Sequence, residues 1–584
     1  MVAFLLLVGL LVLLVLFAIA YPLGPWAWTV VLGIVLALIG VLIYDLTQRR
    51  HSILRNYPLI GHIRYMLESI RPELQQYFIE RNYDGKPFDR DTRSMVYARA
   101  KGQDDHKAFG TERNIRELGY EYFLQSVAPV APPEHPPKIT IGGPDCTQPY
   151  QISLMNISSM SFGALSDKAV LAMNKGAALG NFVHETGEGG ITKYHLEYGA
   201  DLFWEIGSGY FGCRNHDGSF NAERFAEKAR WPQVKGVTIK VSQGAKPGLG
   251  GVLPAAKLTP AIAQARDVPM GQDCVSPASH PEFSTPRELM EFVARLRELS
   301  DGKPVGYKFC VGSRVDVLSM CKAMLDTGIT PDFIIIDGAE GGTGAAPLEY
   351  EDTVGAPLTE GLMVMHNALV GCGLRGKIKI GVAGKIALGS DIVKRLIQGA
   401  DFTMSARAMM MATGCIQSQR CHTNKCPVGV TSQNPRLTRA LDVEDKGTRV
   451  YNYHKLTVKE AVQLMASMGV SDTAMLNPRM LRRRVDHYGT RSYASMFSWL
   501  RPGQLLEEPP QGWGLDWRDA DPDRFGLARL DPFPHLRGEL EAGGSHLHGQ
   551  AAHPQYYPER DDHQGSSRTK PKASDVPRPE GQPG

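Results

Sequence analysis

The chain has 584 residues, of which 43% are hydrophobic and 21% charged, a balance typical of a folded protein with a sizeable core. Its formal net charge of +3 is too close to neutral to indicate a nucleic-acid partner. Three of its nine cysteines share one short segment and the others lie far apart, which indicates core thiols in a reducing compartment and not a disulfide framework.

The N-terminus is strongly apolar, with no Asp, Glu, Lys or Arg before Asp45. Two runs, Val2–Ala20 and Trp26–Tyr44, are each about one bilayer long, and we predict a transmembrane helical hairpin over residues 1–50. A cleaved signal peptide is the alternative for the first run, although that run lacks a basic start. Three arginines follow the second run: Arg49, Arg50 and Arg55. The positive-inside rule then predicts a multi-pass protein of the inner (cytoplasmic) membrane, with its catalytic domain in the cytoplasm.

Residues 51–137 form a polar N-terminal extension and connector with little catalytic signal. Ile63–Glu80 has helical character, which Arg71-Pro72 is expected to break. Val127–Pro137 is rich in proline, and we expect an extended connector there.

From residue 138 to residue 433, short apolar runs alternate with helical periods. The predicted strands are Gln151–Ile157, Asn181–His184, Gly236–Val241, Val305–Val311, Phe333–Asp337, Ile378–Val382 and Asp401–Ser405. The predicted helices are Ser166–Leu179, Thr285–Leu299, Arg314–Thr327, Thr359–Val370 and Ser390–Gln398. Repeated β–α units predict a parallel α/β fold, and their number favours a (β/α)8 TIM barrel over an open doubly wound sheet. No Gly-x-Gly-x-x-Gly follows the first strand, which counts against a Rossmann dinucleotide site.

Glycine is concentrated where several predicted strands end. The segments concerned are Ile157–Ser166, Ser242–Gly251, Asp337–Ala345 and Gly381–Ile386. In a barrel this end carries the active site, and glycine lets backbone N–H groups approach an anion closely. Glycine that only makes tight turns is the alternative, but such loops at one end of the barrel favour a binding site.

Cys415, Cys421 and Cys426 form a C-x5-C-x4-C array followed directly by Pro427. Thiolates this close suit an iron–sulfur cluster or zinc. Structural zinc usually takes four protein ligands, whereas a cuboidal cluster that lacks one iron needs three. His422 could be a fourth zinc ligand, so the spacing favours iron–sulfur without excluding zinc; ordinary buried cysteines are a further alternative.

Residues 434–500 are predicted to be a helical, charged C-terminal part, with a basic face at Met480–Val485. Residues 501–584 are rich in Pro, Gly and His. We expect this tail to be largely disordered, above all from about Gly543 onward.

Several segments, in order, resemble the FMN-binding synthase domain of glutamate synthase. They are Met160–Ser166, Thr186–Gly190, Ser242–Gly248, Gly341–Ala345 with Pro347, and the cysteine array with its Cys-Pro-Val-Gly. The resemblance runs from about Ile139 to Gln433. It implies that residues 138–433 form a (β/α)8 barrel that holds FMN, with a [3Fe-4S] cluster on Cys415, Cys421 and Cys426 in the loop 415–426.

The resemblance also implies roles for single residues. FMN would be bound by Met160, Ser161, Phe162, Gly163, Gln243, Lys308, Gly341, Gly342, Thr343, Gly384, Lys385, Ala406 and Arg407. Lys246 and Arg266 match positions that hold the carboxylates of 2-oxoglutarate, and Glu188 matches an acidic residue that orients the imine or handles protons. Lys308 would stabilise the negative charge of reduced flavin. The implied catalytic residues are Lys308, Glu188 and Lys246.

The chain departs from the family at several positions. Leu249 and Val252 replace polar residues, the second at a position that faces the substrate. The phosphate loop reads Ala383-Gly-Lys385, and Ser405-Ala-Arg407 replaces a Gly-Ser type of turn, so that two cations lie near the expected phosphate. No segment resembles the family's amidotransferase domain, and we expect ammonia to come from solution or from a separate glutaminase.

These features predict a membrane-anchored oxidoreductase that reduces 2-iminoglutarate, formed from 2-oxoglutarate and ammonia, to L-glutamate. Electrons would come from ferredoxin or a reductase subunit and pass through the cluster to FMN. Two alternatives stay open. One is an amine or N-substituted glutamate dehydrogenase that passes electrons to a membrane acceptor, and the other is a non-enzymatic electron-relay or scaffold subunit of the membrane.

Overall fold

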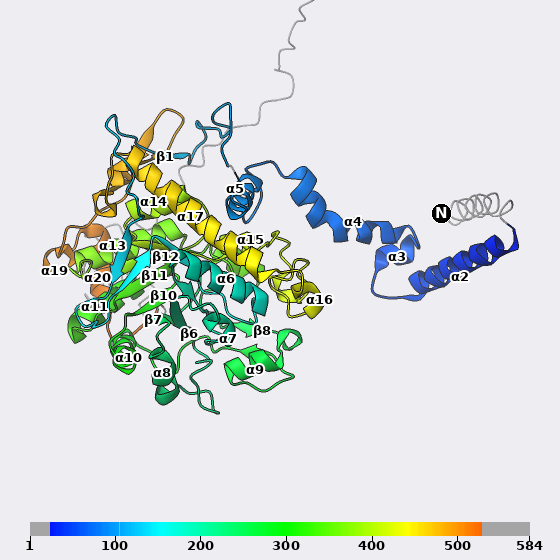
Figure 1. Cartoon of the computed structure of the whole chain (residues 1–584), viewed down its shortest axis with the longest axis horizontal. Coiled ribbons are helices and arrows are strands. Elements are labelled where there is room, and N and C mark those ends of the chain that lie inside the picture. Colours follow the sequence, from blue (N-terminus) through cyan, green and yellow to red (C-terminus); the bar gives the residue numbers. More distant parts are fainter. Residues whose placement is uncertain (1–23, 104, 528–584) are drawn as a thin grey trace, which may run out of the picture. The chain divides into compact units, whose positions relative to one another are not determined.

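A closed parallel barrel of eight strands forms the centre of the protein (Figure 1). The computed structural model describes residues 24–103 and 105–527. The barrel strands follow in chain order: β4 (Met155–Ile157), β5 (His184–Glu185), β6 (Leu202–Ile206), β7 (Val234–Lys240), β10 (Val305–Phe309), β11 (Phe333–Asp337), β12 (Lys379–Ala383) and β13 (Phe402–Ser405). This topology confirms the predicted (β/α)8 barrel.

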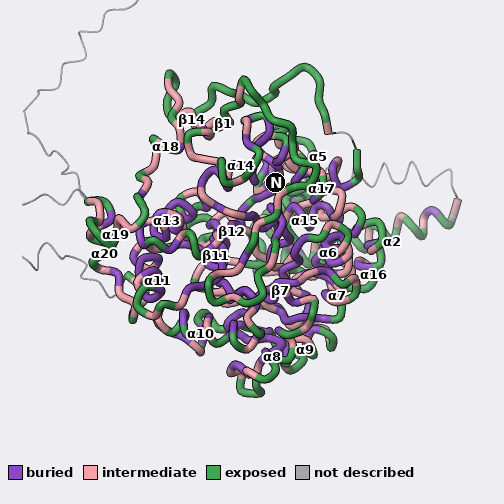
Figure 2. Tube along the Cα trace, turned by 60° about the vertical axis from the view of Figure 1, so that its left-hand side comes forward, coloured by how far each residue is buried: buried purple, intermediate pink, exposed green. Residues whose placement is uncertain are grey.

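Helices connect consecutive strands and cover the outside of the barrel. They are α6 (Asp167–Gly180), α7 (Lys193–Leu196), α8 (Ala222–Ala229), α9 (Pro260–Arg266), α10 (Pro286–Leu299), α11 (Arg314–Thr327), α12 (Leu348–Thr353), α13 (Leu358–Gly371), α14 (Gly389–Ile397) and α15 (Arg407–Ala412). Local signals set their starts; α10, for example, begins with a capping box between Thr285 and Glu288 and has Pro286 in its first turn. Buried residues are concentrated in the strands and in the helices around them (Figure 2).

The predicted first strand, Gln151–Ile157, is two elements. β3 (Tyr150–Ser153) pairs antiparallel with β2 (Lys138–Ile141), and only β4 joins the barrel. Ile141 and Ile152 of this hairpin belong to the same core cluster as three aromatic residues at the starts of barrel strands: Phe203, Phe333 and Phe402. The hairpin therefore closes the N-terminal end of the barrel. The run hid this division because it contains neither glycine nor proline.

Strand β6 is the barrel strand that the apolar pattern did not predict. All five of its residues are buried, including Glu205. A carboxylate within so short an apolar run weakens the signal of a buried strand. Glu205 is buried together with the cation that pairs with it, Lys308 of β10.

The C-terminal part packs on the barrel as helices and a small sheet. α16 (Pro435–Thr438) and α17 (Val443–Ser467) agree with the helical prediction. Met480–Val485 does not, because it contains strand β14 (Leu481–Arg484), which pairs with β1 (Glu121–Phe123) and β15 (Thr490–Ser492). Its partner β15 lies nearby in the sequence, whereas its other partner, β1, lies far away and is not visible in any local pattern. A short helix, α18 (Tyr493–Met496), follows.

Ordered structure continues beyond the expected boundary at residue 501. α19 (Gln504–Glu507) and α20 (Gln511–Asp519) contact the barrel helices α13 and α11. Arg314 lies 4.6 Å from the ring of Trp513 and forms an ion pair with Asp516. The disorder expected from Gly543 onward lies outside the described residues.

The described part of the N-terminus begins with a long apolar helix, α2 (Pro25–Thr47). Its segment Trp26–Thr47, 22 residues long, is apolar enough by length and composition to cross a membrane. The other predicted span, Val2–Ala20, lies outside the described residues. Shorter helices follow: α3 (Ser52–Asn56), α4 (Gly61–Leu74), the π-helix η2 (Gln75–Ile79) and α5 (Arg90–Ala100). Pro72 does not break α4, which continues into the wider turn of η2.

Candidate functional site

A narrow cavity of about 50 Å³ lies at the end of the barrel where the strands finish. Its wall is built from the ends of β4, β7, β10, β11, β12 and β13, the loops after them, and Phe88 of the N-terminal extension. The lining residues are Phe88, Ser158, Ser159, Gln243, Lys308, Asp337, Gly341, Gly342, Ala383, Gly384, Lys385, Ile386, Met404, Ala406 and Arg407. This end carries the active site in (β/α)8 barrels.

The cavity gathers many of the residues predicted to bind FMN: Gln243, Lys308, Gly341, Gly342, Gly384, Lys385, Ala406 and Arg407. Thr343 does not line it. The segment Met160–Gly163 lies instead against the loop after β5, where a Cβ on Gly187 would come within 2.4 Å of the Ser161 backbone nitrogen. Ser158 and Ser159 take the expected place of that segment in the cavity wall.

Lys308 in the cavity wall is part of a buried ionic network. It donates hydrogen bonds to the carboxylate of Glu205 and the hydroxyl of Ser159, whose backbone N–H in turn donates to Glu185 at 2.9 Å. Burial alone would lower the pKa of Lys308, but Glu205, Glu185 and Asp337 raise it above its usual range. Lys308 is therefore cationic and already balanced by carboxylates. Burial raises the pKa of Glu185 to about 7, against the opposing effect of Lys308.

Glu185→Gln is expected to remove a pH dependence of stability. The Glu185 pKa is raised from 4.5 to about 7 on folding, so its stabilising contribution is complete below about pH 4.5 and is lost as pH rises through 7. The urea midpoint of the variant, relative to the wild type, should therefore increase between about pH 5 and about pH 8. A midpoint difference that is the same at both pH values would contradict this assignment.

Lys385 and Arg407 bring positive charge to the cavity wall. Within the described part of the chain neither cation forms an ion pair with a carboxylate; Arg407 donates to the Glu340 carbonyl at 2.6 Å and lies 5.1 Å from the Phe88 ring. Burial lowers the pKa of both groups, and Arg407 adds to the effect on Lys385. A Cβ on Gly342 would lie 2.7 Å from Arg407 Nε, so the backbone approaches this cation closely. Unpaired cations beside bare backbone fit a phosphate group.

Glu188 is the centre of a second charged cluster. Lys240 Nζ lies 3.1 Å from its Oε1, and the Ser276 hydroxyl donates to its Oε2 at 3.5 Å. Burial alone would raise the pKa of Glu188, but Lys240, Arg266 and Lys246 hold it below its usual range. The carboxylate is therefore ionised at neutral pH. Lys240 is the member of this cluster that the sequence did not reveal.

Arg266 and Lys246 are buried, and no carboxylate of the described residues forms an ion pair with either. Arg266 donates to the Ser161 hydroxyl and the Phe162 carbonyl, both at 3.2 Å, and its Nε is buried without a partner among those residues. Burial, together with the charge of Lys240, lowers the pKa of Lys246. Three cations around one carboxylate leave net positive charge, which suits an anionic substrate.

The two substituted positions, Leu249 and Val252, lie close to Gly251, which approaches Glu188. Val252 is 48% exposed in the short strand β8 (Val252–Leu253), which pairs with β9 (Cys274–Val275). Leu249 lies in the loop before β8. Gly251 is the last residue of that loop, and a Cβ on it would lie 2.4 Å from Glu188 Oε1. The loop that borders Glu188 is thus apolar at both substituted positions.

The cysteine array lies in the loop after α15. Side chains outside the loop donate to its backbone carbonyls: Tyr97 to Cys415 at 2.8 Å, Gln76 to Ile416 at 3.0 Å and Lys257 to Cys421 at 3.2 Å. Burial and the neighbouring thiols raise the pKa of Cys415 to about 12. In residues 24–103 and 105–527, no group of three or more His, Cys, Asp and Glu side chains is placed to hold a metal ion. The cluster therefore stays a prediction.

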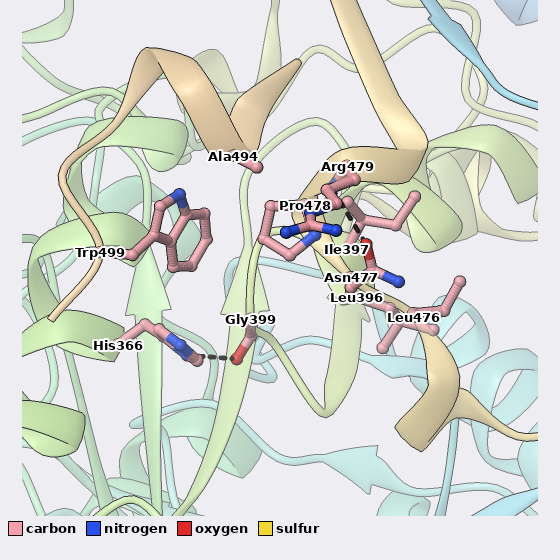
Figure 3. A pocket seen from close by; sticks show the side chains of 10 residues that line it. All are labelled: His366, Leu396, Ile397, Gly399, Leu476, Asn477, Pro478, Arg479, Ala494 and Trp499. Atoms are coloured by element: carbon pink, nitrogen blue, oxygen red, sulfur yellow. Dashed lines mark hydrogen bonds between the residues drawn. The ribbon is translucent and has the colours of Figure 1, made fainter. Parts of the chain in front are cut away.

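A larger pocket, of about 600 Å³, lies between α13, the end of α14 and the C-terminal segment (Figure 3). His366 and Trp499 face Pro478 and Arg479 across it, and Gly399, just before β13, lies at its base. His366 contacts the Gly399 carbonyl at 3.4 Å, and burial together with Arg375 lowers the pKa of His366 to about 4. With a neutral imidazole and no carboxylate in its lining, this pocket lacks the paired acid and base groups of the first cavity.

Comparison with known proteins identifies the family. Residues 133–471 match the model described as the conserved region in glutamate synthase. The glutamate synthase large subunit-like protein YerD of Bacillus subtilis (strain 168) is 36% identical over 496 residues, 76% of this chain and 94% of that protein. The archaeal glutamate synthase (NADPH) of Methanocaldococcus jannaschii is 33% identical over 329 residues, 56% of this chain and 61% of that protein.

Among solved structures, a flavocytochrome b2 variant with sulfite bound aligns with 81% of this chain and 95% of its own, at 14% identity and a TM-score of 0.39. The family match instead rests on the conserved region, which spans more than half of the chain, and on the long alignment with the Bacillus protein. This chain belongs to the glutamate synthase family.

Proposed function

We propose that this oxidoreductase of the glutamate synthase family binds FMN and a [3Fe-4S] cluster and reduces 2-iminoglutarate, formed from 2-oxoglutarate and ammonia, to L-glutamate. The observation that carries the proposal is the cluster of Lys246, Arg266 and Glu188 beside a cavity lined by glycine and unpaired cations. Bound FMN would supply the electrons for reduction of a carbon–nitrogen double bond.

The residues of the barrel cavity suit FMN. Lys385 and Arg407 would bind the phosphate, with the backbone of Gly341, Gly342 and Gly384 beside it. Gln243 and Lys308 would meet the polar edge of the ring. Because Glu205 already balances Lys308, this cation is held in place before the cofactor binds, so little reorganisation is needed.

The residues around Glu188 suit a dicarboxylate with an imine. Arg266 and Lys246, which lack carboxylate partners in the described structure, would bind the two carboxylates of 2-oxoglutarate. Glu188, ionised and held by Lys240, would orient the positively charged iminium nitrogen. The low pKa of Glu188 makes it a stabiliser of this cation and a weak proton donor.

The cofactor content of the full chain, purified without oxygen, tests this proposal. We expect FMN together with iron and sulfide in the ratio of a three-iron cluster, shown by absorption spectra and chemical analysis. Bound zinc without flavin would overturn the proposed chemistry.

Arg407→Ala and Lys385→Ala are each expected to weaken FMN binding. A hydrogen bond to a charged group contributes about 1.5–3 kcal/mol, which corresponds to an increase in Kd of roughly 10- to 150-fold. Titration of the apoprotein with FMN, followed by flavin fluorescence, measures the change. Arg479→Ala, which removes a cation from the other pocket, is the matched control and should bind as the wild type does. Equal Kd values in all three variants would contradict the phosphate assignment.

Cys421→Ser and Cys426→Ser are expected to lose iron and sulfide while they retain FMN, because the cysteine loop lies outside the cavity wall. The control is Cys146→Ser, a partly exposed thiol outside the array. Iron analysis per flavin decides the matter: unchanged iron in the first two variants, or an equal loss in the control, would show that these thiols do not bind the cluster.

We further propose that the protein is anchored in the inner membrane, with its catalytic domain in the cytoplasm. The apolar α2 and the arginines after it support this placement. Electrons would come from ferredoxin or a reductase subunit, and ammonia from solution or a separate glutaminase.

The apolar loop positions Leu249 and Val252 favour a second candidate, a dehydrogenase of amines or N-substituted glutamates that passes electrons to a membrane acceptor. Anaerobic mixing of the oxidised protein with a panel of amino acids separates the two candidates. Flavin reduction by an amine substrate, without glutamate formation in the opposite direction, would favour the second.

A further inference from the structure

Helix α4 and the π-helix η2 carry a continuous apolar stripe on their surface. Its members recur at intervals of three and four residues, which places them on one side of the helix: Ile63, Met66, Leu67, Ile70, Leu74 and Tyr77. Each is between 38% and 55% exposed. We call this surface the α4 stripe. Glu68 lies on the opposite side of the helix.

The α4 stripe has no cover in the described part of the chain. Gly61 is the one buried residue of α4, and the helix has its main contacts with α3 and η2, not with the barrel. A run of exposed large apolar side chains on one helix face marks a surface that contacts another protein or a membrane.

The residues around the α4 stripe indicate that the contacting surface is a membrane. The apolar helix α2 is almost entirely exposed in the structure, and it ends shortly before α4. Arg49, Arg50 and Arg55 lie between the two helices. Arg71 lies on α4 beside the stripe, and Arg64 of the same helix pairs with Glu68 at 3.2 Å. An apolar face flanked by arginines is the pattern of a helix that lies in the headgroup region of an anionic bilayer.

A second copy of the chain is a poorer fit to the α4 stripe. A helix of 14 residues is about 21 Å long, and one face of it covers far less than the ~800 Å² per partner of a stable protein interface. We propose that the α4 stripe lies in the boundary between headgroups and acyl chains, as a second membrane contact beyond α2.

This contact would position the cysteine loop. Gln76 of η2 donates to the Ile416 carbonyl at 3.0 Å, and Glu73 at the end of α4 pairs with Arg420 at 2.9 Å. A helix held in the membrane surface and tied to the loop at its far end keeps that loop close to the lipid. The inference concerns the placement of the chain and does not depend on the substrate of the proposed function.

Photolabelling of the full chain in lipid nanodiscs tests the inference. The discs contain phosphatidylethanolamine, phosphatidylglycerol and a lipid with a diazirine on its acyl chain, and labelled peptides are identified by mass spectrometry. We expect label on peptides of α2 and on peptides within residues 61–79. The variant Ile63→Ser/Leu67→Ser/Ile70→Ser should lose the second label and keep the first. Glu68→Gln, on the opposite side of the helix, is the control and should keep both labels.

Label on α2 alone in the wild type would overturn the inference and leave the proposed membrane anchor intact. Cross-links between residues 61–79 of two copies, without lipid label there, would overturn it in favour of self-association. Loss of label on α2 peptides would instead contradict the proposed anchor, because α2 and α4 are scored on separate peptides.

Discussion

Lys308→Met is expected to lower the free energy of unfolding by about 3–5 kcal/mol, because it leaves the buried Glu205 without its cation. Both side chains are almost fully buried, so solvent cannot replace the lost ion pair. Urea unfolding of the apoprotein near neutral pH measures the effect without a contribution from bound FMN. The same variant should bind FMN weakly, since Lys308 lines the cavity.

The double variant Lys308→Met/Glu205→Gln separates charge from packing. Removal of both charges should recover much of the stability that the single variant loses, because the carboxylate that pairs directly with Lys308 is removed together with it. If Lys308→Met lost less than about 1 kcal/mol, or if the double variant were as unstable as the single one, the ionic network would not have the role assigned to it.

Arg266→Ala is expected to cause the largest loss of activity. Removal of one member of a buried charge pair costs about 2–5 kcal/mol, a decrease in kcat/KM for 2-oxoglutarate of roughly 30- to 4,000-fold. Arg266 is buried, and within the structure described it has hydrogen bonds only to neutral groups, so its charge is available to a substrate carboxylate. Steady-state rates of glutamate formation measure the change. Arg266→Lys keeps the charge but not the planar fork, and should recover part of the activity.

The matched control for Arg266→Ala is Arg295→Ala, which removes an exposed arginine of α10 paired with Glu282. Its rates should equal those of the wild type, since exposed pairs contribute little. If Arg266→Ala kept wild-type kcat/KM for 2-oxoglutarate while it lost activity with an amine substrate, the second candidate function would replace the first.

Most of the barrel could be predicted from the sequence, because buried parallel strands are short apolar runs with glycine at their C-terminal ends. Phe333–Asp337 and Arg314–Thr327 match the structure residue for residue. The misses have physical causes. β6 contains Glu205, whose charge is neutralised by Lys308 from a strand about a hundred residues later, a fact that no local pattern contains. β14 likewise depends on a distant partner, β1.

The candidate site was predictable where residues belong to glycine-rich loops, and not where they reach it from elsewhere. Gln243, Lys308 and Arg407 line the cavity as expected. Phe88 comes from an extension without any catalytic signal, and the pairing of Lys240 with Glu188 depends on how β7 lies beside the loop after β5. The closure of the barrel and the register of its strands bring such residues together. The spacing of residues in a single sequence does not reveal these contacts.

The most direct test of the central claim is a single turnover under anaerobic conditions. The full chain in nanodiscs, with its FMN reduced in advance, is mixed with 2-oxoglutarate and ammonium while flavin absorbance is followed and the product is quantified. We predict that the flavin is reoxidised only when both compounds are present, with one L-glutamate formed per flavin. Flavin that stays reduced in their presence, or is reoxidised without formation of glutamate, would contradict the account.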